Sequence, residues 1–317
     1  MNKFLAVIII LFFAISCQDK ESKAIDVSNI NATAKVVRFD QLFYNASSEN
    51  LNEVKKRFPY LFPAQNNDSI WLNKIKNEQE LFQQVSNKFN NFSSEQKELE
   101  QLFKHIKHYQ PSFNEPKTIT LITNLDYQNK IIYADSLLLV SLDMYLGSEN
   151  KVYNDFPKYL SKNYNKSRLV IDVAESIASN YLIKERNREF ITAIINEGKK
   201  MFLIDSYLPN KTDFEKIGYT QNEFEWAETN EAMIWKYFIE NKLLFSTKTD
   251  LNERFIANAP FSKFYIDIDK ESPGRIGVYL GWQIVKAFSK NNNVTLHQLL
   301  ETNANEIFKK SKYKPKK

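Results

Sequence analysis

The stretch "AIINEGKKMF", residues 193–202, lies inside a long apolar segment that determines much of the fold. Between residues 168 and 203 apolar side chains recur on helical spacing almost throughout. This periodicity predicts two consecutive helices that meet near residues 184–187. A helix of this kind must bury its apolar side against other elements, so we expect it at the centre of the core.

A second long helix is predicted at residues 272–288, "SPGRIGVYLGWQIVKAF". Ser272 is expected at the N-cap, and Pro273 in the first turn, where its missing N–H costs nothing. Gly277 and Gly281 fall on one face of this helix, because residues four apart lie on the same side. We therefore expect another helix to approach it closely at the two glycines.

Shorter patterns predict more helices and a small sheet. The alternation in "KTITLITNL" (117–125) and "KIIYADSLLLVSLDMYLG" (130–147) predicts two or three antiparallel strands. Further helices are expected at residues 67–88, from a capping box at Ser93 to near Tyr109 before Pro111, from a capping box at Thr220, and at residues 295–310.

The domain organisation follows from what the chain lacks. After residue 35 the sequence shows no internal repeat and no linker rich in Pro, Gly or Ser. Hydrophobic residues make up 43% of the 317 residues, which is enough to bury a sizeable core. We predict one α+β domain over residues 35–317, mostly helical with a small antiparallel sheet.

The charge pattern argues against a nucleic-acid partner. The net charge is only +5, and Lys and Glu are interspersed along the chain, which is typical of a solvated surface. The basic block at residues 309–317 is expected to be a solubilising tail, with weak attraction to anionic lipid or polymer as the alternative.

The N-terminus is typical of a bacterial lipoprotein. The apolar run at residues 4–15 follows Lys3 and is too short to span a bilayer, which takes about 20 residues. It has the length of a signal-peptide core and ends in small residues before Cys17, as in a lipobox. We predict a signal peptide at residues 1–16, cleaved before Cys17, with an ordinary signal peptide or an uncleaved anchor as alternatives.

Cys17 is then the predicted lipidation site. It is the only Cys in the chain, so no intramolecular disulfide and no cysteine zinc site can form. Several acyl chains on this residue would hold the protein on a membrane. Residues 17–34 are expected to be a tether, and the domain to face the periplasm, with the inner and outer membranes as alternatives.

Five residues of the opening stretch match the spacing of a zinc-protease H-E-x-x-H helix. Glu197 is present, but Asn196 and Lys200 occupy the positions of the two histidines, which must lie one turn apart to bind one metal ion. Glu231 could serve as a downstream ligand. We predict no metal, no cofactor and no catalytic residue here. Instead we expect a polar cluster of Asn196, Glu197, Lys200 and Glu231, with Lys199 or Lys200 paired to Glu231.

Two other groups of polar residues are candidate sites. His105 and His108 lie at i and i+3 of a predicted helix, where a solvated face is a better interpretation than a metal site. Asp269 and Glu271 precede a helix start and Arg275 follows them. They predict either capping with a buried Arg–carboxylate network or a polar pocket for a peptide, a glycan or a partner's side chain.

Several longer blocks together resemble one family. They are E-G-K-K (197–200), N-E-x-x-I-W (230–235) and E-S-P-G-R-x-G-x-x-x-G-W-Q-I-V (271–285), with "VVRFDQLFYN" (36–45) and the lipobox before them. In this order they resemble the GldB-type gliding-motility lipoproteins of Bacteroidetes. Such proteins also look distantly similar to zincin-like domains, which implies a degenerate zincin-like core in which "NEGKK" is a decayed metal site.

The resemblance implies a role but no reaction. It implies an envelope lipoprotein needed for gliding, in cells whose adhesins move by a machinery shared with type IX secretion. We expect a non-catalytic accessory or scaffold protein whose partners are the membrane and other gliding-motility envelope proteins. The alternatives are an envelope hydrolase of zincin descent and a ligand-binding lipoprotein with a pocket near Arg275.

Overall fold

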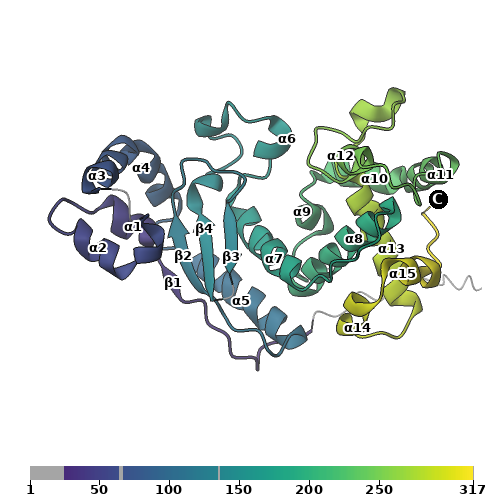
Figure 1. Cartoon of the computed structure of the whole chain (residues 1–317), viewed down its shortest axis with the longest axis horizontal. Coiled ribbons are helices and arrows are strands. Elements are labelled where there is room, and N and C mark those ends of the chain that lie inside the picture. The colour runs from purple at the N-terminus through teal and green to yellow at the C-terminus, as the bar shows by residue number, and fades with distance from the viewer. Residues whose placement is uncertain (1–24, 64–66, 135, 317) are drawn as a thin grey trace, which may run out of the picture.

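In the computed structural model, a small sheet lies between a group of short N-terminal helices and a larger helical C-terminal part (Figure 1). The structure describes residues 25–63, 67–134 and 136–316. The predicted signal peptide and the lipidation site Cys17 lie outside the described residues. The predicted α+β class, mostly helical within one domain, is confirmed.

The sheet has four strands in the order β1-β2-β4-β3. They are β1 (Val36–Val37), β2 (Lys117–Leu121), β3 (Ile131–Ala134) and β4 (Leu137–Ser141). Only β3 and β4 pair antiparallel, while β2 is parallel to both β1 and β4. The sheet is therefore mixed: the predicted antiparallel pairing holds for β3 and β4 and is wrong for β2. Strands β3 and β4 form a hairpin, and the long connection after β2 lets the second strand of this hairpin, β4, lie next to β2. The periodicity of side chains within a strand does not indicate the order of strands in a sheet.

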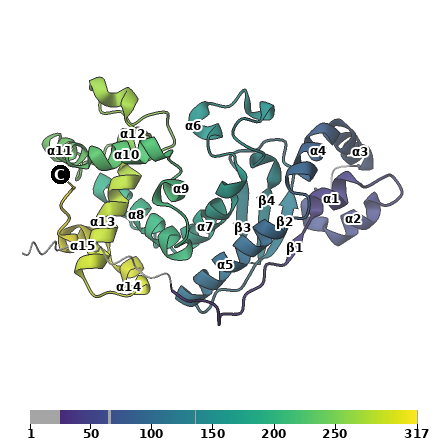
Figure 2. The ribbon, with the colours of Figure 1, turned by 180° about the vertical axis from the view of Figure 1, so that it is seen from behind.

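The N-terminal helices lie beside this sheet and across one of its faces (Figure 1 and Figure 2). Helix α5 lies across the face that Figure 2 shows, and it ends before Pro111 as predicted. The expected helix at residues 67–88 is divided in two at Glu78. The helices are α1 (Phe39–Tyr44), α2 (Leu51–Arg57), η1 (Pro59–Leu61), α3 (Asp68–Asn77), α4 (Gln79–Lys88) and α5 (Ser93–Tyr109).

The packed part of the chain begins earlier than predicted. Ala32 and Ala34 are buried in the core, although they were expected to belong to the tether. The backbone carbonyl of Asn31 accepts a hydrogen bond from Lys107 of α5 at 3.2 Å. Small apolar side chains fit against a helix without needing a helix or strand of their own, so no periodic pattern marked this segment.

The middle of the chain forms the predicted pair of long helices. They are α7 (Leu169–Asn180) and α8 (Phe190–Tyr207), joined by residues 181–189. Before them come the short elements η2 (Leu142–Met144), η3 (Lys151–Tyr153), α6 (Lys158–Ser161) and η4 (Lys166–Arg168). Helix α7 also contacts β3, so it connects the sheet to the C-terminal part.

The regular elements described in the C-terminal part are all helices. Its elements are α9 (Asp213–Ile217), α10 (Gln221–Thr229), α11 (Glu231–Glu240), α12 (Asp250–Phe255), η5 (Asp267–Glu271), α13 (Ile276–Asn291), α14 (Leu296–Glu301) and α15 (Ala304–Ser311). The predicted capping box at Thr220 is confirmed. The single helix expected at residues 295–310 is two helices, because a second N-cap at Asn303 starts α15.

Helix α13 starts later than predicted. Ser272 is not its N-cap, since its hydroxyl donates to the carbonyl of Asp269 at 2.7 Å. Arg275 takes the N-cap position instead, in the left-handed region at φ 63°. Pro273 and Gly274 form the turn before it, where a Cβ on Gly274 would lie 2.2 Å from the carbonyl oxygen of Ala259.

Helices α8 and α13 cross with their backbones in contact. A Cβ built on Gly198 would lie 2.3 Å from the carbonyl oxygen of Gly281, and one built on Gly281 would lie 1.7 Å from that of Ile194. Gly277 faces the backbone of Phe255 in α12. The predicted close approach at the two glycines is confirmed, and the glycine of "NEGKK" is part of it.

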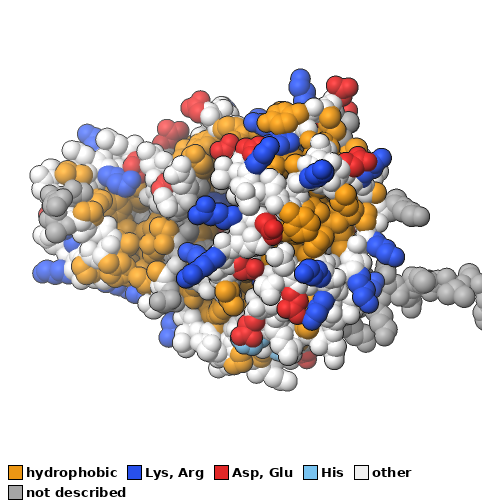
Figure 3. Space-filling model, turned by 45° about the vertical axis from the view of Figure 1, so that its right-hand side comes forward, with side chains coloured by type: hydrophobic (Ala, Val, Ile, Leu, Met, Phe, Trp, Pro, Cys, Tyr) orange, Lys and Arg blue, Asp and Glu red, His pale blue; other side chains and the backbone are white. Residues whose placement is uncertain are grey.

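The surface carries mixed charge. The face in Figure 3 shows Lys and Arg side chains interspersed with Asp and Glu, and apolar side chains gathered between them. Among the described helices, none combines the length and apolarity needed to span a membrane.

Candidate functional site

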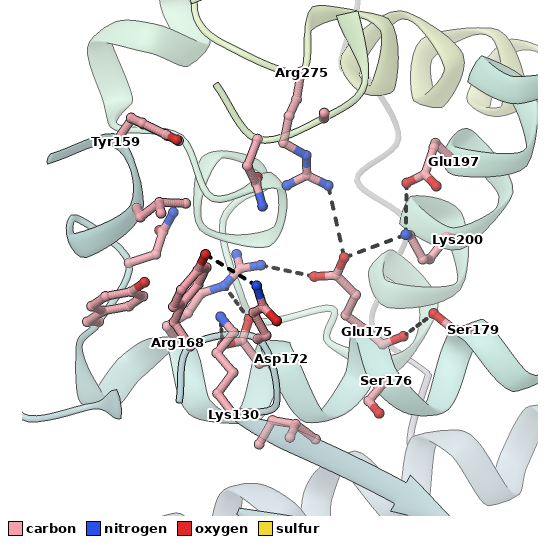
Figure 4. A pocket seen from close by; sticks show the side chains of 18 of the residues that line it. Lys130, Tyr159, Arg168, Asp172, Glu175, Ser176, Ser179, Glu197, Lys200 and Arg275 are labelled. Atoms are coloured by element: carbon pink, nitrogen blue, oxygen red, sulfur yellow. Dashed lines mark hydrogen bonds and ion pairs between the residues drawn. The ribbon is translucent and has the colours of Figure 1, made fainter. Parts of the chain in front are cut away.

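A cavity of about 760 Å³ lies where the sheet, α7 and the C-terminal helices meet (Figure 4). Its walls come from the loop before β3, from α6 and the turn after it, from α7 and α8, and from the segments before α13. Many of its lining side chains are charged. This is the place where "NEGKK" and Arg275 come together.

Glu175 of α7 lies at the centre of the charged group (Figure 4). Its carboxylate is 3.2 Å from Nη2 of Arg168, 3.6 Å from Nζ of Lys200 and 4.0 Å from Nη2 of Arg275. Burial alone would raise the pKa of Glu175, but the charges of Lys200, Arg275, Arg168 and Lys130 lower it to about 2. The carboxyl group is therefore ionised at neutral pH.

Asp172 forms a second centre one turn earlier in α7. Nε of Arg168 donates to it at 2.8 Å, Nζ of Lys130 lies at 2.5 Å, and the hydroxyl of Tyr145 donates at 2.9 Å. Arg168 also donates through Nη1 to the carbonyl of Glu215 at 2.6 Å. All the nitrogens of this guanidinium thus have acceptors in the protein, which fixes α7 against α9.

Two residues of "NEGKK" face the cavity. Nζ of Lys200 lies 2.8 Å from Glu197, and the 3.6 Å contact with Glu175 joins this pair to α7. Burial would lower the pKa of Lys200, but Glu175 and Glu197 outweigh that effect and raise it. Lys200 therefore keeps its charge.

Lys199 points elsewhere, because the next residue of a helix is rotated by about 100°. It is buried, and its Nζ donates to the carbonyl oxygens of Thr302 at 2.7 Å and Leu300 at 3.3 Å and to Glu185 at 3.2 Å. Burial lowers the pKa of Lys199, and Glu185 opposes that shift. This lysine ties α8 to the end of α14.

The expected contact of Lys199 or Lys200 with Glu231 is wrong. Glu231 is buried and accepts hydrogen bonds from the hydroxyl groups of Tyr279 at 2.9 Å and Tyr313 at 2.6 Å. Among the described residues no ion pair joins it to either lysine, because Lys200 meets the carboxylates of Glu175 and Glu197 instead.

Asn196, the remaining member of the predicted cluster, lies partly buried on α8. Its side-chain oxygen Oδ1 is buried and has no hydrogen-bond partner within the described chain. Only Glu197 and Lys200 of the four predicted residues therefore lie in one group. In the described part of the chain, no three His, Cys, Asp or Glu side chains are grouped as metal ligands would be.

The predicted pocket residues also separate. Arg275 lines the cavity and donates through Nη1 to the carbonyl of Ile217 at 3.0 Å. Asp269 instead accepts the backbone N–H groups of Phe264 and Tyr265, each at 2.9 Å, and so closes a loop. Glu271 is exposed. A pocket does lie beside Arg275, but its carboxylate partner is Glu175.

His105 differs from the expected solvated face. Its side chain is buried, Nδ1 has no partner among the described residues, and burial lowers its pKa, with His108 adding to the effect. His108 is exposed as predicted. The sequence pattern does not distinguish a histidine on the buried side of α5 from one on the exposed side.

The comparison with known families decides the identity of the chain. The family model described as gliding motility protein GldB matches residues 20–315, which is nearly the whole chain. The chain belongs to the GldB family. This family is one of gliding-motility lipoproteins. No curated protein and no solved structure matches the chain.

Three charged residues of this GldB-family cavity were not predicted as site residues. They are Arg168, at the N-cap of α7, and Asp172 and Glu175, which follow it at i+4 and i+7 and so lie on the same side of the helix. In the otherwise apolar sequence "RLVIDVAESIAS" this charged face is a signal that could have found them. Lys130 carries no such signal, since it comes from the loop before β3.

Proposed function

We propose that the chain is a lipid-anchored, non-catalytic accessory protein of the gliding machinery in the cell envelope. The observation that carries the proposal is the GldB family match over residues 20–315. The lipobox ending at Cys17 supports attachment to a membrane through lipid, with the domain in the periplasm. Its partners would be other envelope proteins of the gliding machinery, which is shared with type IX secretion.

The electrostatics of the cavity support a non-catalytic role. A general acid or base works best when its pKa lies near the working pH. The pKa of Glu175 is about 2, so this carboxyl group is a weak base and holds no proton to donate at neutral pH. Glu197 is bound in an ion pair with Lys200.

The packing supports a scaffold role. Helices α8 and α13 meet backbone to backbone, and Lys199 and Glu231 fasten the C-terminal segments to them. Such an arrangement holds the C-terminal helices in fixed positions and suits a protein that presents a surface to partners.

Crosslinking in living cells tests this proposal. The chain would be crosslinked in its native envelope and the attached proteins identified, with a second envelope lipoprotein of similar abundance as the control. We expect components of the gliding machinery to be enriched among the proteins crosslinked to this chain and not among those crosslinked to the control lipoprotein. Equal recovery of the same proteins on the control would contradict an accessory role in gliding.

A further inference from the structure

We propose that the cavity beside Glu175 binds a small ligand that carries a carboxylate group, held between Lys200 and Arg275. This inference goes beyond the proposed role in motility and does not depend on it. It rests on which cations of the cavity lack acceptors, on the charge of the lining, and on the composition of the opposite wall.

The first observation is the uneven use of hydrogen-bond donors. Arg168 donates through all of its guanidinium nitrogens to protein acceptors. The guanidinium of Arg275 makes one hydrogen bond within the described chain, from Nη1 to the carbonyl of Ile217. Its 4.0 Å approach to Glu175 is too long for another. Arg275 therefore presents donors to the cavity that Arg168 does not.

Lys200 is the second cation of the cavity that has unused hydrogen-bond donors. It has three N–H donors but only one close partner, Glu197 at 2.8 Å, and its contact with Glu175 is 3.6 Å long. Lys200 and Arg275 approach the same oxygen, Oε1 of Glu175. The two cations are therefore near enough for one small anion to contact both, and charge-assisted hydrogen bonds of this kind are strong.

The lining charge selects the kind of anion. Four cations line the cavity (Lys130, Arg168, Lys200 and Arg275) against three carboxylates (Asp172, Glu175 and Glu197). The excess is one positive charge, which a carboxylate with its single negative charge balances. A phosphate dianion would leave a net negative charge in a cavity that already holds three carboxylates, and like charges repel. A carboxylate is thus the better fit.

The side of the cavity opposite Lys200 suits the rest of a ligand whose carboxylate group is bound by Lys200 and Arg275. Tyr127, Tyr159, Tyr164 and Leu160 are among the residues that line the cavity, and Figure 4 shows Tyr159 across the cavity from Lys200. The hydroxyl of Tyr164 is buried and lacks a partner among the described residues. Aromatic faces with polar tips bind flat, partly polar groups. A peptide C-terminus and a sugar acid both combine such a body with a carboxylate.

Calorimetric titration of the full-length chain in detergent tests the proposal. The probes are acetyl-Ala-Ala with a free carboxylate and its C-terminal amide, glucuronate and neutral glucose, and inorganic phosphate. We expect binding of at least one carboxylate probe and not of its neutral partner. The peptide and sugar pairs distinguish the two sources of the carboxylate. Absence of binding by both carboxylates, equal binding of a neutral partner, or tighter binding of phosphate would overturn the proposal.

Variants assign the binding to the two cations. Lys200→Met and Arg275→Asn should each weaken the carboxylate probe about tenfold or more. Asn tolerates the left-handed backbone at position 275. Lys236→Met, on the exposed surface of α11, is the matched control and should bind like the parent chain. If either cavity variant shows the circular dichroism of the parent chain and binds the carboxylate probe with unchanged affinity, the assignment to these two cations is refuted. A result of this kind from one variant is enough.

Discussion

Gly198 of α8 and Gly281 of α13 are in contact through their backbones, because neither carries a side chain to hold the helices apart. Gly198 is the central residue of "NEGKK". The spacing that resembles a zinc-protease helix therefore coincides with the backbone contact between α8 and α13. The lysine on one side of Gly198 enters the core, and Glu197 on the other side enters the cavity.

Gly198→Ala should destabilise the protein. The added methyl group would lie 2.3 Å from the carbonyl oxygen of Gly281, so the helices must separate. Overpacking of this kind costs about 1–3 kcal/mol of unfolding free energy, which we expect urea denaturation to show. Lys236→Ala, on the exposed face of α11, is the control and should change stability little. Parent-like stability of Gly198→Ala would contradict a backbone contact between α8 and α13 at this residue.

Lys199→Met should also destabilise the chain, for a different reason. Methionine fills a similar volume, but the carbonyl oxygens of Leu300 and Thr302 and the carboxylate of Glu185 lose a shared donor. Removing one partner of a buried charged group costs about 3 kcal/mol or more. Urea denaturation measures the loss, with Lys236→Met as the matched control. Equal stability of the two variants would show that Lys199 is dispensable.

The pH dependence of stability should reflect Glu175. Its pKa falls from an ordinary value of 4.5 to about 2 in the folded chain. A carboxyl group with a lowered pKa stabilises the folded state above its unfolded pKa, and this contribution is lost as pH falls toward the folded pKa. We expect the stability difference between the parent and Glu175→Gln to be constant above about pH 5 and to shrink as the pH falls toward 2. A difference that stays constant over that range would contradict the charge network around Glu175.

Cys17→Ala should release the protein from membranes. Without the thiol no lipid can be attached, and no described helix is long and apolar enough to span a bilayer. Fractionation of cells into soluble and membrane parts measures the change, with Ser16→Ala as a control that leaves the thiol in place. Retention of Cys17→Ala in the membrane fraction would refute lipid as the anchor.

Metal analysis separates the accessory role from a hydrolase of zincin descent. At the two positions of the zinc histidines the chain has Asn196 and Lys200, and Lys200 is paired with carboxylates. We expect the purified chain to hold zinc well below one ion per molecule after dialysis. Stoichiometric zinc that disappears in Glu197→Ala would favour the hydrolase instead.

Local sequence patterns predicted the positions of helices and strands better than they predicted which elements and side chains pair with one another. Apolar periodicity located α7 and α8, and the capping box at Thr220 located α10, because each depends on residues close in sequence. The order of the strands depends on which segments meet across the molecule. The same holds for Lys200, which pairs with Glu175 of α7 rather than with Glu231. Charge complementarity alone could not choose between the two carboxylates.

The candidate site was predictable in part. Arg275 lines a cavity, whereas the sequence left a capping network and a pocket open as alternatives for this segment. The predicted grouping of Arg275 with Asp269 and Glu271 is wrong, because residues close in sequence need not be close in space: Arg275 lies near Glu175 instead. The charged face of α7 was readable at i, i+4 and i+7, but only the fold shows that it borders a cavity.

Colony spreading of a strain that lacks this chain tests the proposed role most directly. The deletion strain would be compared with the same strain carrying the parent chain or Cys17→Ala, with growth in liquid as the control for general fitness. We predict normal growth, loss of spreading, and restoration by the parent chain but not by Cys17→Ala. Normal spreading of the deletion strain would contradict a role in gliding motility.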